Sequence, residues 1–159
     1  MRNFFGILWV TESTDGLGTF RQLTHGRTKH GTEFVTGPLR GHPTTYFGPH
    51  SGVGVVIQAV QSQHAQMKTG IVGLGAGTMA AWGRAGDTIR FYEINPDDEA
   101  VARRWFTYLK DSKAKVDVAL GDARVVLERE LAEGARGDYD MIVLDAFFKR
   151  CDSDAPVNV

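Results

Sequence analysis

The spacing of hydrophobic and polar residues changes near residue 50. Before that point, short runs rich in β-branched and aromatic residues are separated by turn signals such as Asp15-Gly16 and Gly26-Arg27. This pattern predicts a small antiparallel β region over residues 1–50. We expect its strands at residues 3–11, 19–26 and 28–36.

After residue 50, apolar runs alternate with amphipathic stretches, which predicts a parallel sheet with helical connections. One helix start is sharply marked, because Asn95 can cap it and Pro96 suits its first position. We therefore expect an α/β fold with a Rossmann-type parallel sheet over residues 51–159. Its strands are expected at 69–74, 88–94, 115–120 and 139–147, and its helices at 51–64, 78–84, 95–109 and 122–133.

Composition narrows the classes of partner and compartment. The formal net charge of −1 over 159 residues provides no overall field to attract nucleic acid or an anionic membrane. The longest apolar runs are far too short to span a bilayer, and the N-terminus lacks the pattern of a secretory signal. A single cysteine, Cys151, cannot form an intrachain disulfide, so we expect a cytoplasmic protein.

Glycines cluster between an expected strand and an expected helix, in the run Gly73-Leu74-Gly75-Ala76-Gly77-Thr78. Glycine lets the backbone approach a ligand closely, and the following helix start offers free N–H groups. A dinucleotide-binding turn would have glycine at Thr78, so the pattern is closer to the nucleoside-binding turn of methyltransferase-type folds. Gly73, Gly75 and Gly77 are therefore candidate ligand-binding residues. The alternative is a tight turn with no ligand.

Acidic residues lie at or just after the carboxyl ends of three of the expected strands. Glu93 lies 20 positions after Gly73, where Rossmann-type domains place an acid for ribose hydroxyls, although it could also be a solvated strand-end residue. Asp122 could cap the next helix, accept a hydrogen bond from an adenine amino group, or do both. Asp145 follows a run of apolar residues at the carboxyl end of a strand, where open α/β sheets bind ligands. We expect a catalytic role for Asp145, and the alternative is an acid that binds nearby backbone.

Histidines do not indicate a metal site. His25 and His30 are five positions apart, which would place them on opposite faces of a single strand. No pair of His or Cys residues has the spacing of a zinc motif. We therefore expect no metal cofactor.

Taken in order along the chain, these motifs resemble the spermidine synthase family, in particular its bacterial spermidine-synthase-like branch. The resemblance covers nearly the whole chain. It is carried by Arg2–Val10, Leu23-Thr24-His25-Gly26, Lys29-His30-Gly31, Thr44–Phe47, Ser51–Gly54, Gly73–Thr78, Tyr92–Pro96, Gly121–Arg124 and Leu144–Phe147.

The resemblance implies aminopropyl transfer from decarboxylated S-adenosylmethionine to a polyamine amine such as putrescine, leaving methylthioadenosine. It assigns Glu93 to the ribose, Asp122 to the adenine and Asp145 to catalysis. Tyr46 resembles a family tyrosine near the substrate groove, and Asp154 matches a second family aspartate. One departure is Glu33, because many family members have glutamine at this position.

Two other functions fit the same residues. A methyltransferase would use S-adenosylmethionine and a different acceptor, and a non-catalytic protein would bind the nucleoside without turnover. After Asp145 the chain lacks the family's remaining strands, so we expect an incomplete Rossmann-type sheet. The apolar strand at residues 141–144 would then be an exposed edge, which favours pairing with another chain. A homodimer is expected, since the family commonly dimerises.

Overall fold

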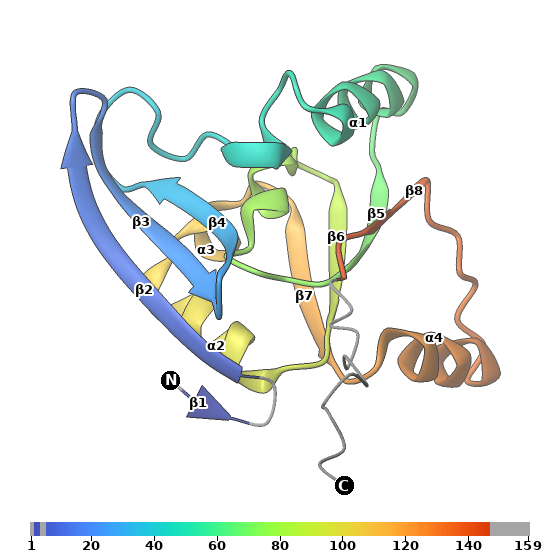
Figure 1. Cartoon of the computed structure of the whole chain (residues 1–159). Coiled ribbons are helices and arrows are strands. Elements are labelled where there is room, and N and C mark those ends of the chain that lie inside the picture. Colours follow the sequence, from blue (N-terminus) through green and yellow to red (C-terminus); the bar gives the residue numbers. More distant parts are fainter. Residues whose placement is uncertain (1, 4–5, 147–159) are drawn as a thin grey trace, which may run out of the picture.

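The computed structural model describes residues 2–3 and 6–146, which form two sheets (Figure 1). The N-terminal sheet is antiparallel, in the order β1-β2-β3-β4. Its strands are β1 (Arg2–Asn3), β2 (Gly6–Asp15), β3 (Gly18–His25) and β4 (Thr28–Phe34). The expected antiparallel region is confirmed, but β2 continues to Asp15. Its polar end stays paired because the tight turn to Gly18 holds the register, with Asp15 opposite Gly18.

The second sheet has four strands, all parallel, in the order β7-β6-β5-β8. Its strands are β5 (Lys68–Val72), β6 (Thr88–Glu93), β7 (Lys115–Leu120) and β8 (Met141–Leu144). The chain is thus α/β, and this sheet is compatible with a Rossmann-type fold. The strand order reverses between β5 and β8, and such a reversal is where open parallel sheets bind ligands.

The helical segments connect these strands. They are η1 (Thr45–Phe47), α1 (Gly52–Gln63), η2 (Thr78–Trp82), α2 (Pro96–Trp105), α3 (Tyr108–Asp111) and α4 (Ala123–Ala132). The segment after the glycine run is a 3-10 helix, whereas the sequence predicted a longer helix over 78–84.

The single helix expected over residues 95–109 is wrong, because α2 ends at Trp105. Phe106 has extended backbone angles and is buried. The next N–H group, on Thr107, donates to the carboxylate of Glu33 at 2.9 Å instead of continuing the helix. A side chain 74 positions away in sequence therefore ends α2.

Two clusters of buried side chains make the core. The larger one lies between the parallel sheet and the segments α1, η2 and α3, and includes Phe47, Ile71 and Phe91. The smaller one joins β2 and β3 to the rest of the chain, since it contains Leu8, Leu23, Ala76, Val101 and Phe106. Residues from the β region and from the α/β region thus share one cluster.

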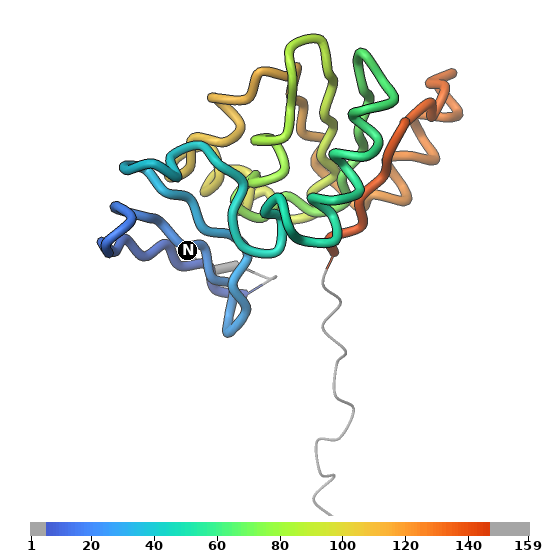
Figure 2. The backbone as a smooth tube through the Cα atoms, turned by 90° about the horizontal axis from the view of Figure 1, so that it is seen from above, coloured from blue at the N-terminus to red at the C-terminus, as the bar shows by residue number. Residues whose placement is uncertain are grey.

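The other face of the parallel sheet is only partly covered. Helix α4 packs there, and its Glu130 binds Arg90 and Tyr92 of β6. Ile142 and Leu144 of β8 are 53% and 78% exposed. Figures 1 and 2 show β8 and α4 on the side of the molecule away from β2 and β3. Among the described residues β8 pairs only with β5, so the expected edge position is confirmed for this part of the chain.

Candidate functional site

Backbone segments from β5 and β8 meet where the strand order reverses. Gly73, directly after β5, has a φ of +99°, and a Cβ atom there would lie 2.5 Å from the carbonyl oxygen of Asp145. The Asp145 N–H group donates to the Val72 carbonyl at 2.8 Å. The first candidate glycine therefore lets the predicted catalytic residue lie directly against the turn.

The N-terminal sheet covers the middle of the same turn. A Cβ atom on Gly75, whose φ is +53°, would lie 2.6 Å from the carbonyl oxygen of His30. In β4 itself, a Cβ atom on Gly31 would lie 2.5 Å from that of Ala76. The third glycine, Gly77, faces Leu109. Close approach of backbone carbonyls explains Gly73 and Gly75, and the Leu109 side chain explains Gly77, independently of any ligand.

Glu93 is buried at the end of β6, so it is not a solvated strand-end residue. Its Oε2 accepts from the Leu74 N–H and its Oε1 from the Asn95 N–H, each at 2.8 Å. Burial raises the pKa of Glu93, and the backbone hydrogen bonds oppose that rise. Each carboxylate oxygen can accept more than one hydrogen bond, so the group can still take ribose hydroxyls.

Tyr46 and Asp145 lie near each other at the carboxyl ends of the parallel strands. The Tyr46 side chain is 40% exposed, and its hydroxyl lies close enough to the Asp145 carboxylate to influence the pKa of that group. Burial and the charge of Glu93 raise the pKa of Asp145 to about 6, and the bond from Tyr46 opposes them. Burial and the Asp145 charge raise the pKa of Tyr46 to about 12. Two residues 99 positions apart in the chain thus influence each other's pKa.

The residue before Tyr46 has an unusual backbone. Thr45 has a φ of +57°, and it is the one non-glycine residue with positive φ in the described part of the chain. A β-branched residue in this region is strained, because its side chain crowds its own backbone. The strained Thr45 lies directly before Tyr46, whose hydroxyl affects the pKa of Asp145.

Asp122 is exposed and caps α4. Its Oδ1 accepts from the N–H groups of Arg124 and Val125, at 3.0 and 3.2 Å. The neighbouring Gly121 N–H donates to the Glu93 carbonyl at 2.8 Å, which places the cap beside the end of β6. The capping role is therefore confirmed, and the adenine contact stays a prediction. The last candidate, Asp154, lies outside the described residues.

Asp98 is a buried acid that was not among the predicted site residues. Asp98 is one of the acids in the first turn of α2, where a negative charge suits the helix dipole, and it is 8% exposed and accepts from Asn95 Nδ2 at 2.7 Å. Burial and the nearby charge of Glu93 raise the pKa of Asp98 to about 6. The spacing was a usable signal, because an acid three residues after a helix cap can turn back toward the cap.

Among the described residues, the hydrogen bonds of the Glu33 carboxylate go to Thr107 and not to Asp145. Its carboxylate accepts from the backbone N–H and the hydroxyl of Thr107 and is almost fully buried. Burial raises the pKa of Glu33, and the two bonds from Thr107 oppose the rise. Glu33 therefore joins β4 to the start of α3.

The two histidines lie on neighbouring strands, so the expectation of opposite faces of one strand is wrong. His25 ends β3 and His30 lies in β4, and their ring centroids are 5.5 Å apart. Burial and the neighbouring His25 lower the pKa of His30. Across the described residues, no group of three or more His, Cys, Asp and Glu side chains could hold a metal ion.

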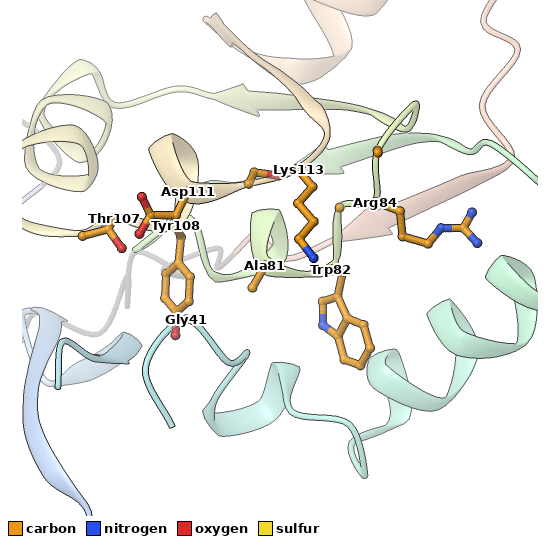
Figure 3. A pocket seen from close by; sticks show the side chains of 11 residues that line it. Gly41, Ala81, Trp82, Arg84, Thr107, Tyr108, Asp111 and Lys113 are labelled. Atoms are coloured by element: carbon orange, nitrogen blue, oxygen red, sulfur yellow. The ribbon is translucent and has the colours of Figure 1, made fainter. Parts of the chain in front are cut away.

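A hollow of about 570 Å³ lies between η2 and α3 (Figure 3). Its lining includes Trp82, Tyr108, Asp111 and Lys113, and none of the predicted site residues. The segments that line it lead into the starts of β6 and β7, whereas ligands of open parallel sheets bind at the carboxyl ends. The Tyr108 hydroxyl is already bonded to two backbone carbonyls. We therefore place the candidate site at Asp145.

No family model, curated protein or solved structure matches this chain. Within the described ranges, no helix is both long and apolar enough to cross a lipid bilayer. What the chain does is therefore inferred from its own residues, above all from those that meet at the ends of β5, β6 and β8.

Proposed function

We propose that the chain binds an adenosyl-sulfur ligand and transfers the aminopropyl group of decarboxylated S-adenosylmethionine to a polyamine amine. The observation that carries the proposal is the partly buried Asp145, whose backbone lies directly against the glycine turn, with the Tyr46 hydroxyl near its carboxylate. It places a partly buried base at the reversal of strand order, where parallel sheets bind ligands. The resemblance to spermidine synthases supplies the reaction.

In this proposal the nucleoside lies along the carboxyl ends of β5, β6 and β7. Glu93 accepts the ribose hydroxyls, and the exposed Asp122 accepts from the adenine amino group. Gly121 bonds to the Glu93 carbonyl, so these two acids belong to adjacent backbone segments. The order glycine turn, Glu93, Asp122 then follows the order sulfur, ribose, adenine along the ligand.

The chemical step requires a neutral amine. The amine lone pair forms a bond to the aminopropyl carbon next to the sulfonium, and the carbon–sulfur bond breaks with its electron pair passing to sulfur. Methylthioadenosine leaves as a neutral thioether, and the proton of the attacking nitrogen passes to Asp145. With a pKa raised to about 6, Asp145 is a stronger base than an exposed aspartate and is still ionised at neutral pH.

Incubating the protein with putrescine and decarboxylated S-adenosylmethionine, followed by mass spectrometry, tests the proposal. We expect spermidine from the wild type and none above background from Asp145→Asn. Asp138→Asn is a matched control, because Asp138 precedes the opposite end of the same strand and is ion-paired to Lys68. Activity that survives Asp145→Asn would contradict the assignment of the base.

Two further experiments separate the other two candidates. A methylated amine formed from S-adenosylmethionine would indicate a methyltransferase. Titration calorimetry with methylthioadenosine identifies a protein that binds the nucleoside without turnover. A folded sample that releases no heat with this ligand would overturn the binding site itself.

A further inference from the structure

A groove runs between β2 and α2, away from the proposed catalytic site. Its volume is about 510 Å³, and its lining includes Leu8 and Val10 of β2 and Val101, Arg104 and Trp105 of α2. Leu8 and Val101 belong to the smaller core cluster, and Val10 packs against it. Figure 1 shows α2 behind the long strand β2 at the margin of the molecule. Apolar side chains of the core are therefore reachable from solvent beside this strand.

The outer edge of β2 has no strand beside it for most of its length. On this edge β1 pairs only with Gly6 and Ile7, and from Trp9 to Asp15 no further strand follows among the described residues. The stretch 9–15 contains neither proline nor lysine, and its register with β3 runs without a bulge. Three features that commonly block the addition of a strand are thus missing from this edge.

Alternation along β2 identifies the backbone groups that face outward. The Ile7 carbonyl accepts from the Gly26 N–H at 3.0 Å, so Ile7 faces β3. Successive residues of a strand turn their backbone groups to opposite edges, so the N–H and C=O groups of Val10 and Glu12 point away from β3. Because the Val10 side chain lines the groove, the outward-facing backbone and the groove form one continuous surface.

Arg104 gives this surface a positive charge. Its side chain is exposed and lines the groove, with the guanidinium carbon 5.3 Å from the centroid of the Trp105 ring. Within the described part of the chain Arg104 has no acidic partner. Glu12, which lies on the same edge, is ion-paired to Arg21. The surface is therefore complementary to an acidic side chain from another molecule.

We propose that this surface binds an extended, acidic peptide segment of another protein, which adds to β2 as an antiparallel strand. The peptide backbone bonds to the outward-facing groups of Val10 and Glu12, which are about 7 Å apart along the edge. On the face toward α2, an apolar side chain of the peptide enters the groove, and an acidic side chain two positions away meets Arg104. On the opposite face, its alternate side chains pack against Trp9, which is 51% exposed.

The open edge and the charge of Arg104 together favour this occupant. A small molecule could fill the groove, but it would leave the outward-facing backbone groups of Val10 and Glu12 without partners. A second copy of β2 would bring its own Glu12 to the edge, and that carboxylate is already bonded to Arg21 of the same chain. A peptide with an acid of its own satisfies both the edge and Arg104.

Fluorescence anisotropy of a labelled synthetic peptide tests the proposal. The probe is a peptide of about nine residues with capped ends. It carries threonine on one face of the strand and valine, leucine, glutamate and valine, in that order, on the other. We expect saturable binding, and binding at least about tenfold weaker for a peptide with lysine in place of glutamate. N-methylation of the leucine and glutamate amides, which face β2 in an antiparallel pair, should abolish binding. Equal binding of all three peptides would overturn the proposal.

Charge reversal in the protein tests the role of Arg104. Arg104→Glu should weaken binding of the glutamate peptide by about tenfold and strengthen binding of the lysine peptide, because attraction and repulsion are exchanged. A gain in affinity for the lysine peptide cannot arise from loss of folding. Lys29→Glu, the same change at an exposed position on β4, is the matched control and should alter neither affinity. Unchanged affinities in Arg104→Glu would overturn the proposed contact.

Amide hydrogen exchange tests the addition of the strand itself. With the glutamate peptide bound, the Val10 and Glu12 amides should exchange at least about tenfold more slowly, because they gain carbonyl partners. The Trp9 and Thr11 amides already face β3, and they serve as the internal control. Bound peptide without protection of Val10 and Glu12 would overturn the proposal. Protection that appears without peptide, at high protein concentration, would assign the edge to a second copy of the chain and overturn it as well.

Discussion

The Glu93 carboxylate accepts a hydrogen bond of 2.8 Å from the backbone N–H of Leu74. The acid that ends β6 thereby holds the glycine turn that follows β5. Its second oxygen accepts from the Asn95 N–H at the start of α2. One side chain therefore stabilises two of the backbone segments that surround the proposed nucleoside site, and its replacement should affect folding and binding together.

Glu93→Gln tests this double role. Glutamine has nearly the same shape, but its amide NH2 would face one of the two backbone N–H donors and leave it unsatisfied. We expect the free energy of unfolding in urea to fall by about 1–3 kcal/mol. Binding of methylthioadenosine, measured by calorimetry, should weaken as well. Glu128→Gln, a change at an exposed position on α4, is the control. A Glu93→Gln protein with wild-type stability would show that the Glu93 carboxylate does not stabilise the two backbone segments.

Tyr46→Phe should move the pH dependence of activity. The Tyr46 hydroxyl stabilises the charged form of Asp145, and so opposes the rise in pKa that burial and Glu93 cause. Without it the pKa of Asp145 should rise further, on the order of one pH unit for one hydrogen bond. The acid limb of the rate profile, which falls as Asp145 is protonated, should shift to higher pH. Tyr139→Phe should leave that limb in place, and an unchanged limb in Tyr46→Phe would exclude the coupling.

Asp98→Asn should remove a pH-dependent loss of stability. Burial and the charge of Glu93 raise the pKa of Asp98 from 3.8 to about 6, so the folded protein binds its proton more tightly than the unfolded chain does. Stability from this group is complete below pH 4 and is lost as pH rises through 6. The variant should therefore gain on the order of 1–3 kcal/mol relative to wild type between pH 4 and 7. Urea unfolding of both proteins at several pH values measures the difference in their free energies of unfolding. A difference that does not change with pH would refute the prediction.

Thr45→Gly should separate stability from activity. Glycine accepts the positive φ of +57° without the crowding that threonine suffers. Relief of strain offsets the entropy cost of glycine. We therefore expect the free energy of unfolding to stay within about 1 kcal/mol of the wild-type value or to increase. Turnover should fall, because Tyr46 is held less firmly. Thr28→Gly, at an exposed strand position, serves as the comparison and should lower stability.

The strands and most of the helices follow from local sequence. Apolar runs predicted the parallel strands, and Asn95-Pro96 marked the start of α2, because strand periodicity and helix caps depend on neighbouring residues. The glycine run and Glu93 were likewise found from their spacing. These features needed no knowledge of distant contacts.

Contacts between remote residues decided the rest. Glu33 ends α2 through Thr107, and Tyr46 lies near enough to Asp145 to affect its pKa, yet no local pattern records either pairing. His25 and His30 come together because a turn places them on adjacent strands. Asp98 is an acid in a first helical turn by sequence, and only packing against the Glu93 segment makes it a buried group with a raised pKa. Burial and charge proximity arise from three-dimensional packing, so the sequence determined which residues are available and the tertiary structure determined which of them interact.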